Sequence, residues 1–178
     1  MALLITGGAL TLMGLKIPIK AALADLLLDD AWQHAATTRQ LVKPWPWLDS
    51  YPVARLKIPR LGVDQIILAG DSGAVLAFAP GLNDHFDAMG IAVISGHRDT
   101  HFNFMKNLDE GDLLRLERYD GNRSSYVVNR LFVVNSNSIQ IDTSGAGHQA
   151  LILITCWPVD SPVPGGEERW VVEAVRLR

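Results

Sequence analysis

Residues 150–156 read ALILITC, an apolar run that ends on the single cysteine of the chain. A short apolar run rich in β-branched residues and bounded by turn signals is typical of a buried strand. Trp157 and Pro158 follow, and proline removes a backbone donor, so a loop must begin there. The sequence therefore places Cys156 at the end of a buried strand.

Further runs of this kind occupy most of the chain after Tyr51, separated by Gly, Pro, Asn and Asp. They predict strands at 53–58, 63–69, 91–95, 112–117, 125–135, 150–155 and 170–176. Weak helix signals occur only at 72–78 and 102–107. Strands at this spacing, without long helices between them, predict a β-barrel or a β-sandwich, in which the long run at 125–135 bends and pairs with two neighbours.

Composition narrows the function classes. The chain has 178 residues, 48% of them hydrophobic, and its 16 Lys and Arg against 19 Asp and Glu give a net charge of −3. This length suits one domain with a small extension. A single cysteine excludes an intrachain disulfide and a cysteine-rich metal site. The absence of a basic run argues against nucleic acid as a partner, because phosphate neutralisation dominates that kind of binding.

The N-terminal segment 1–20 resembles a membrane anchor. Residues 1–15 carry no charge, but a bilayer requires about 20 apolar residues. The segment also lacks the basic start of a signal peptide, and Lys16 and Lys20 follow it rather than precede it. A membrane anchor shortened at its start and an apolar helix packed on the domain both remain open, and we expect the anchor.

Residues 21–50 predict a stalk and a linker. Apolar residues recur every three or four positions over 21–40, which indicates an amphipathic helix. The run KPWPW at 43–47 cannot continue that helix, because its two prolines remove donors and restrict the residues before them. We expect its tryptophans to dock on the β-domain or to lie at a membrane surface. The β-domain then spans 51–178.

Three residues carry candidate chemistry, and each lies at a strand terminus. Cys156 ends one strand, His97 follows the strand at 91–95, and Arg169 precedes the strand at 170–176. Taken alone, each has an ordinary explanation: an inert buried thiol, a surface histidine, or an arginine paired with a nearby glutamate. Together, a nucleophilic thiol, a proton-transferring imidazole and a fixed cation make an acyl-transfer site.

This combination resembles the sortases, which are membrane-bound cysteine transpeptidases. The run ILITC at 152–156 looks like the family's Thr-Leu-x-Thr-Cys strand, with Ile152 departing at the first position. The run SGHR at 95–98 resembles the segment that carries the family's histidine, and Arg169 follows the cysteine where the family's arginine is expected. More narrowly, three runs look like the single-copy sortases of Gram-negative proteobacteria: KPWPW at 43–47, LAFAPG at 76–81 and GHRDTHF at 96–102.

The resemblance implies a mainly β fold, a closed barrel of about eight strands with short helices, preceded by an N-terminal helix. It makes 51–178 a catalytic domain in which Cys156 is the nucleophile and His97 is the acid and base. Arg169 would then bind the oxyanion or the substrate backbone. Supporting or substrate-contacting roles fall on Thr155, Asp99 and Trp157. No cofactor and no metal are expected.

The resemblance also implies the partners and the compartment. The substrate would be an exported protein with a Leu-Pro-x-Thr-Gly-like sorting signal near its C-terminus, cleaved between Thr and Gly through a Cys156 thioester. An amine of unknown identity would accept the acyl group. The chain would cross the inner membrane once through its N-terminal segment, with the catalytic domain facing the periplasm.

Three alternatives remain open. A cysteine peptidase would use the same residues but release the cleaved protein to water. A metal-dependent hydrolase would use His97, Asp99 and His101, which alternate as H-x-D-x-H and would face one way on an extended segment. A membrane-tethered β-domain that only binds partners would leave Cys156 incidental.

Overall fold

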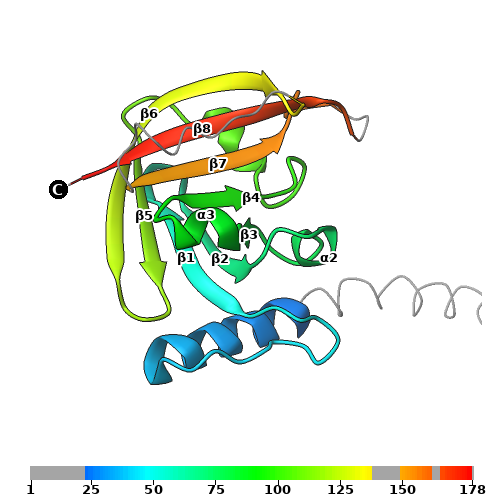
Figure 1. Cartoon of the computed structure of the whole chain (residues 1–178), viewed down its shortest axis with the longest axis vertical. Helices are drawn as coiled ribbons and strands as arrows, with labels where there is room; N and C mark the ends of the chain where they lie inside the picture. The colour runs from blue at the N-terminus through cyan, green and yellow to red at the C-terminus, as the bar shows by residue number, and fades with distance from the viewer. Residues whose placement is uncertain (1–22, 138–148, 162–164, 178) are drawn as a thin grey trace, which may run out of the picture.

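The strands of the protein close into a barrel in the order β1-β2-β3-β4-β7-β8-β6-β5 (Figure 1). The computed structural model describes residues 23–137, 149–161 and 165–177. The strands are β1 (Pro52–Ile58), β2 (Val63–Ala69), β3 (Gly81–Leu82), β4 (Ala92–Ser95), β5 (Leu113–Arg118), β6 (Arg123–Asn135), β7 (Ala150–Cys156) and β8 (Glu168–Arg176). The predicted mainly β fold, a closed barrel preceded by a helix, is confirmed.

The predicted strands form, the one at 63–69 with the predicted bounds and the others with ends shifted by at most two residues. The long strand β6 pairs with β5 and with β8, and its register with β8 shifts between Val128 and Arg130, so it does serve two neighbours. The strand β3 was not predicted. It contributes only Gly81 and Leu82, which pair with β2 on one side and β4 on the other. A strand of two residues is too short to show an alternation of apolar and polar side chains in the sequence.

Among the described residues, four short helical segments lie between the strands. They are η1 (Pro59–Leu61), α2 (Gly73–Leu76), α3 (Asp84–Ala88) and η2 (Asn103–Asn107). The signals at 72–78 and 102–107 thus correspond to α2 and η2, the latter a 3₁₀-helix. The helix α3 was not predicted, although Asn83 caps it by accepting hydrogen bonds from the backbone of His85 and Phe86.

The barrel core is filled by alternate side chains of each strand. In β7, Leu151 and Leu153 belong to the central core, whereas Ile152 and Ile154 belong to an apolar cluster on the opposite face. Because strand side chains alternate between faces, Cys156 lies on that outer face with the two isoleucines. The thiol is therefore presented outside the barrel and not within its core.

The N-terminal helix, residues 23–38, packs beneath the barrel in the view of Figure 1. Leu28 joins a small apolar cluster with Leu68 of β2 and with Trp45, whose ring lies 4.6 Å from that of Phe78. Trp45 thus docks on the barrel, whereas Trp47 is exposed. The expected anchor at 1–20 lies outside the described residues. No helix within the described ranges is long and apolar enough to cross a membrane.

Candidate active site

The ends of β4 and β7 bring His97 and Cys156 to one edge of the barrel. The two strands are parallel neighbours, with Ser95 opposite Ile154, and the backbone N–H of Gly96 donates to the carbonyl of Ile154 at 3.2 Å. Parallel strands that end together release their following loops at the same edge. His97 and Cys156 therefore leave adjacent strands side by side.

A cavity of about 540 Å³ lies at this edge. His97, Asp99 and Cys156 line it together with Arg98, Thr100, Ser161 and Gly165. The thiol is free and half-buried, while His97 is exposed. Three of the residues singled out in the sequence thus meet in one cavity, although they come from two separate stretches of the chain.

Thr155 lies beneath this cavity and holds the two strand ends together. Its side chain is buried, and its hydroxyl donates to the carbonyl of Gly96 at 2.8 Å. Gly96 precedes His97 and Thr155 precedes Cys156, so this bond fixes the backbone on which both candidate catalytic side chains stand. The supporting role of Thr155 stays a prediction, and this contact is the one through which Thr155 would support the site.

The loop that carries His97 depends on a close approach at Gly96. A Cβ placed on Gly96 would lie 2.7 Å from the ring of Phe102, which is closer than real Cβ contacts. Phe102 is fully buried in the core, and its backbone N–H donates to the carbonyl of His97 at 2.9 Å. The sequence reasoning did not select either residue, although a glycine directly before a candidate catalytic histidine is a signal that the backbone is approached closely.

Arg169 lies next to Cys156 but turns toward its own loop. The two residues are paired across β7 and β8. The Arg169 guanidinium donates to the carbonyls of Gly166 at 2.7 Å and Glu168 at 2.9 Å. In this arrangement the guanidinium secures the end of the β7–β8 loop, and it would have to leave these carbonyls in order to bind an oxyanion.

Trp157 braces the loop after Cys156 from the side. Its ring stacks on Trp170 with centroids 5.0 Å apart, and its backbone N–H donates to the carbonyl of Glu168 at 3.0 Å. Trp157 lines a neighbouring cavity of about 260 Å³ and does not line the one that holds Cys156. Its position is that of a loop support beside the thiol.

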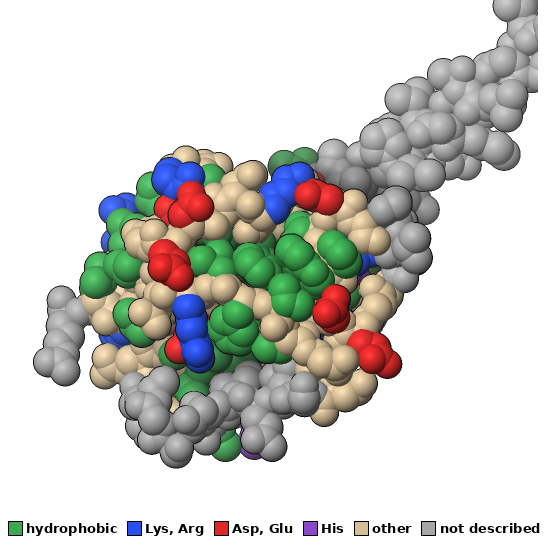
Figure 2. All heavy atoms as spheres, turned by 90° about the horizontal axis from the view of Figure 1, so that it is seen from above, with side chains coloured by type: hydrophobic (Ala, Val, Ile, Leu, Met, Phe, Trp, Pro, Cys, Tyr) green, Lys and Arg blue, Asp and Glu red, His purple; other side chains and the backbone are tan. Residues whose placement is uncertain are grey.

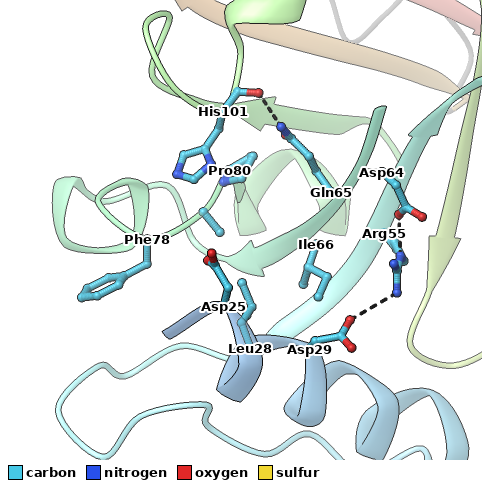
Figure 3. Close-up of a pocket in the computed structure, with 11 residues that line it drawn as sticks. Asp25, Leu28, Asp29, Arg55, Asp64, Gln65, Ile66, Phe78, Pro80 and His101 are labelled. Carbon is cyan, nitrogen blue, oxygen red and sulfur yellow. Dashed lines mark hydrogen bonds and ion pairs between the residues drawn. The ribbon is translucent and has the colours of Figure 1, made fainter. Parts of the chain in front are cut away.

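The H-x-D-x-H pattern does not form a single cluster. The segment turns after His97, and His101 lines a different cavity, between the N-terminal helix and β2, where its carbonyl accepts a 2.6 Å hydrogen bond from the Gln65 amide (Figure 3). Burial lowers the pKa of His101, and the nearby charge of His97 lowers it further. Within the described ranges, no group of three or more His, Cys, Asp or Glu side chains is arranged to hold a metal ion.

The outer face of β4, β7, β8 and β6 is apolar and leads to the thiol. Its side chains include Val93, Phe132, Val134, Ile152, Ile154 and Val171. Figure 2 looks onto the β6 and β8 side of the barrel and shows apolar side chains gathered in the middle, with charged ones around them. Cys156 and Arg169 continue the outward rows of β7 and β8, in which Ile152 and Val171 are themselves buried.

The site therefore brings a thiol, an imidazole and a nearby guanidinium to one edge of the barrel. Groups of these three kinds can together carry out cysteine-dependent acyl transfer.

The comparisons with known proteins agree with this class. The family model of the sortase domain matches residues 56–177. Sortase D of Bacillus subtilis is 31% identical over 125 residues, which cover 68% of this chain and 62% of the relative. The chain thus spans less than two thirds of that relative's length. The chain belongs to the sortase family.

Two solved structures show the same fold. A sortase D5 transpeptidase of Clostridium perfringens matches with a TM-score of 0.63 and 20% identity, covering 88% of this chain and 99% of that chain. A sortase C of the same organism, described with the C-terminal cell wall sorting motif, matches with a TM-score of 0.60 and 18% identity, covering 89% and 90%. At these identities the likeness concerns the fold.

Proposed function

We propose that this protein is a transpeptidase that cleaves a Leu-Pro-x-Thr-Gly-like sorting signal between Thr and Gly, with Cys156 as its nucleophile. The observation that carries the proposal is the cavity that His97 and Cys156 share at the ends of β4 and β7. Family membership supports the class of reaction. The sortase C structure described with a sorting motif supports the choice of substrate.

The proposed chemistry has two halves. In the first, the Cys156 sulfur bonds to the carbonyl carbon of Thr, its proton passes to His97, and His97 then gives that proton to the departing Gly amine as the C–N bond breaks. In the second, an acceptor amine attacks the thioester and loses a proton to His97, and the proton returns to the sulfur as the C–S bond breaks. Arg169, once released from its loop carbonyls, stabilises the oxyanion in both halves.

Ile154 is partly exposed and lies on the same row of β7 as Cys156. It offers an apolar contact for the Leu or Pro side chain of a signal whose later residues reach the thiol. Asp99 is exposed on the wall of the same cavity, two residues after His97.

Peptide cleavage tests this proposal. A Leu-Pro-x-Thr-Gly peptide is incubated with the protein, with and without triglycine, and the products are identified by mass spectrometry. We expect a product joined at Thr to triglycine, and no cleavage by Cys156→Ala or His97→Ala. Cleavage that gives only the free acid in both conditions would instead indicate a peptidase, and loss of activity in EDTA would indicate a metal-dependent enzyme.

We also propose that the N-terminal segment attaches the protein to the inner membrane of a Gram-negative bacterium, with the barrel in the periplasm. The charge-free run 1–15 supports this, as do the exposed Leu23 and Leu26 on the helix that follows it and the exposed Trp47 beside that helix. We expect the protein in the membrane fraction and degraded by protease added to spheroplasts. Recovery in the soluble cytoplasmic fraction would contradict it.

A further inference from the structure

Arg98, the residue directly after His97, is almost completely enclosed. Only 6% of it is exposed, and among the described residues the only other charged side chain buried to this degree is Asp112. A guanidinium keeps its charge at any ordinary pH, so burying it is costly unless its donors are paired. A buried arginine beside the candidate catalytic histidine therefore points to a specific role.

The Arg98 side chain joins the two loops of the site. Its Nη1 donates to the carbonyl of Pro158 at 3.1 Å, and Pro158 is the second residue after Cys156. Arg98 lines the cavity that holds His97 and Cys156, and it also lines the neighbouring cavity bounded by Trp157. It thus stands in the wall between the two cavities.

This bond is one of several ties across the site. The Thr155 hydroxyl and the Gly96 carbonyl make another, between the residues that precede the catalytic pair. The Arg98 bond joins the chain on the other side of the pair. Without the Arg98 bond, the chain after Cys156 would lose a buried link to the segment that carries His97. With both ties, His97 and Cys156 are held from either side.

We propose that Arg98 is a positioning residue that keeps the Cys156 thiol within reach of His97 by holding the Pro158 carbonyl. The inference rests on the proposed function, because this reach matters only if the two side chains carry the reaction. The planar guanidinium makes a directional, charge-assisted bond that a lysine ammonium on a flexible stem does not reproduce. The Arg98→Lys substitution therefore keeps the charge while removing the geometry.

The chain offers a matched control for this contact. Lys106 and Asp160 form an ion pair at 3.2 Å between the same two loops, but their side chains are 39% and 77% exposed. Exposed ion pairs contribute little, because water and salt screen them. Lys106→Ala therefore removes a link between the loops without disturbing the buried one.

Turnover of the sorting peptide gives the first readout. We expect Arg98→Lys to lower kcat by about 10- to 100-fold, with KM changed much less, because a misplacement near 1 Å is sufficient for such a loss. Lys106→Ala is expected to stay within about twofold of the wild type. An Arg98→Lys variant with unchanged kcat would overturn the proposal.

A double-mutant cycle on Cys156 alkylation gives a readout that needs no substrate. Iodoacetamide is used at fixed neutral pH on the wild type, Arg98→Lys, His97→Ala and the double variant. If Arg98 acts by bringing His97 to the thiol, Arg98→Lys slows alkylation by roughly threefold or more, and it has almost no effect in the His97→Ala background. Equal slowing in both backgrounds would mean a general structural role and would overturn the proposal.

Thermal unfolding of each variant completes the design, and Arg98→Gln, which keeps a neutral donor, serves as a second variant. Failure of both variants to fold would contradict the proposal, since Arg98 would then serve the fold. If the wild type cleaves no sorting peptide, the proposed function fails, whereas the alkylation cycle still decides the role of Arg98.

Discussion

Replacing Thr155 with valine removes one buried hydrogen bond and almost nothing else. Valine has nearly the shape of threonine, so the change leaves packing intact and leaves the Gly96 carbonyl without its 2.8 Å partner. Water does not reach this hydrogen bond, because the Thr155 side chain is only 3% exposed. An unsatisfied buried polar group costs about 1–3 kcal/mol. For a chain of this size, that lowers the melting temperature by about 2–12 °C.

The effect on turnover separates this contact from ordinary stability. Gly96 precedes His97, so loosening it displaces the imidazole relative to the thiol, and we expect kcat to fall about tenfold or more. Thr155→Ser keeps the hydroxyl and removes a buried methyl group, which costs about 1 kcal/mol of stability. Its kcat should remain close to that of the wild type.

Circular dichroism melts and peptide-cleavage kinetics measure the two effects. The reasoning would be refuted if Thr155→Val melted lower yet kept its full kcat, because the bond would then serve the fold and not the site. It would equally fail if Thr155→Ser lost as much kcat as Thr155→Val.

Three further predictions concern the support of the site and the pH dependence of the fold. Gly96→Ala forces a Cβ into the Phe102 ring, so we expect roughly 1–3 kcal/mol of destabilisation and a loss of kcat, measured by chemical denaturation and cleavage assay. The hydrogen bond from Arg60 lowers the pKa of Asp112, so this carboxylate contributes stability that is present above its unfolded pKa and lost as pH falls through the lowered one. Asp112→Asn should therefore be less stable at neutral pH and should show a weaker loss of stability in acid. Burial lowers the pKa of His101, so the wild type should lose stability as pH falls below about 6.5, and His101→Asn should lose less over the same range in pH-dependent melts.

Much of the fold could be predicted because apolar runs with clear punctuation form most of the strands. The run at 150–156 predicted both the strand and the place where it ends, since Pro158 follows it closely. The strand β3 could not be predicted, because Gly81 and Leu82 are held by their neighbours and not by a pattern of their own. Similarly, α3 is only one turn long, which is too short for helical periodicity.

That His97 and Cys156 lie at one edge of the barrel could be predicted from the sequence, whereas the directions of the side chains could not. The ends of two strands placed His97 and Cys156 together, as the structure now describes. Where a guanidinium turns depends on the carbonyls that a loop offers, so the bonds of Arg169 to its own loop were not accessible from sequence. The sequence indicates Arg98 only as part of the runs at 95–98 and 96–102. Its burial could not be predicted, because it arises from the loops that pack around it.

The sequence also could not predict which apolar side chains of β7 face out of the barrel. The strand β7 is apolar at every position from Ala150 to Ile154, which predicts a strand buried on both sides, and Ile152 on its outer face is indeed only 9% exposed. The structure divides these residues between the barrel core and the outer cluster that leads to the thiol. Only the closed barrel defines which of the two faces is outside.

The most direct test of the account is the intact mass of the protein after brief mixing with an excess of a Leu-Pro-x-Thr-Gly peptide and quenching in acid. We predict a mass gain equal to the acyl part of the peptide up to Thr, located on Cys156 by digestion, removed by hydroxylamine and absent in Cys156→Ala. Peptide cleavage without any such adduct, or an adduct that persists in Cys156→Ala, would contradict the claim that this thiol carries the reaction.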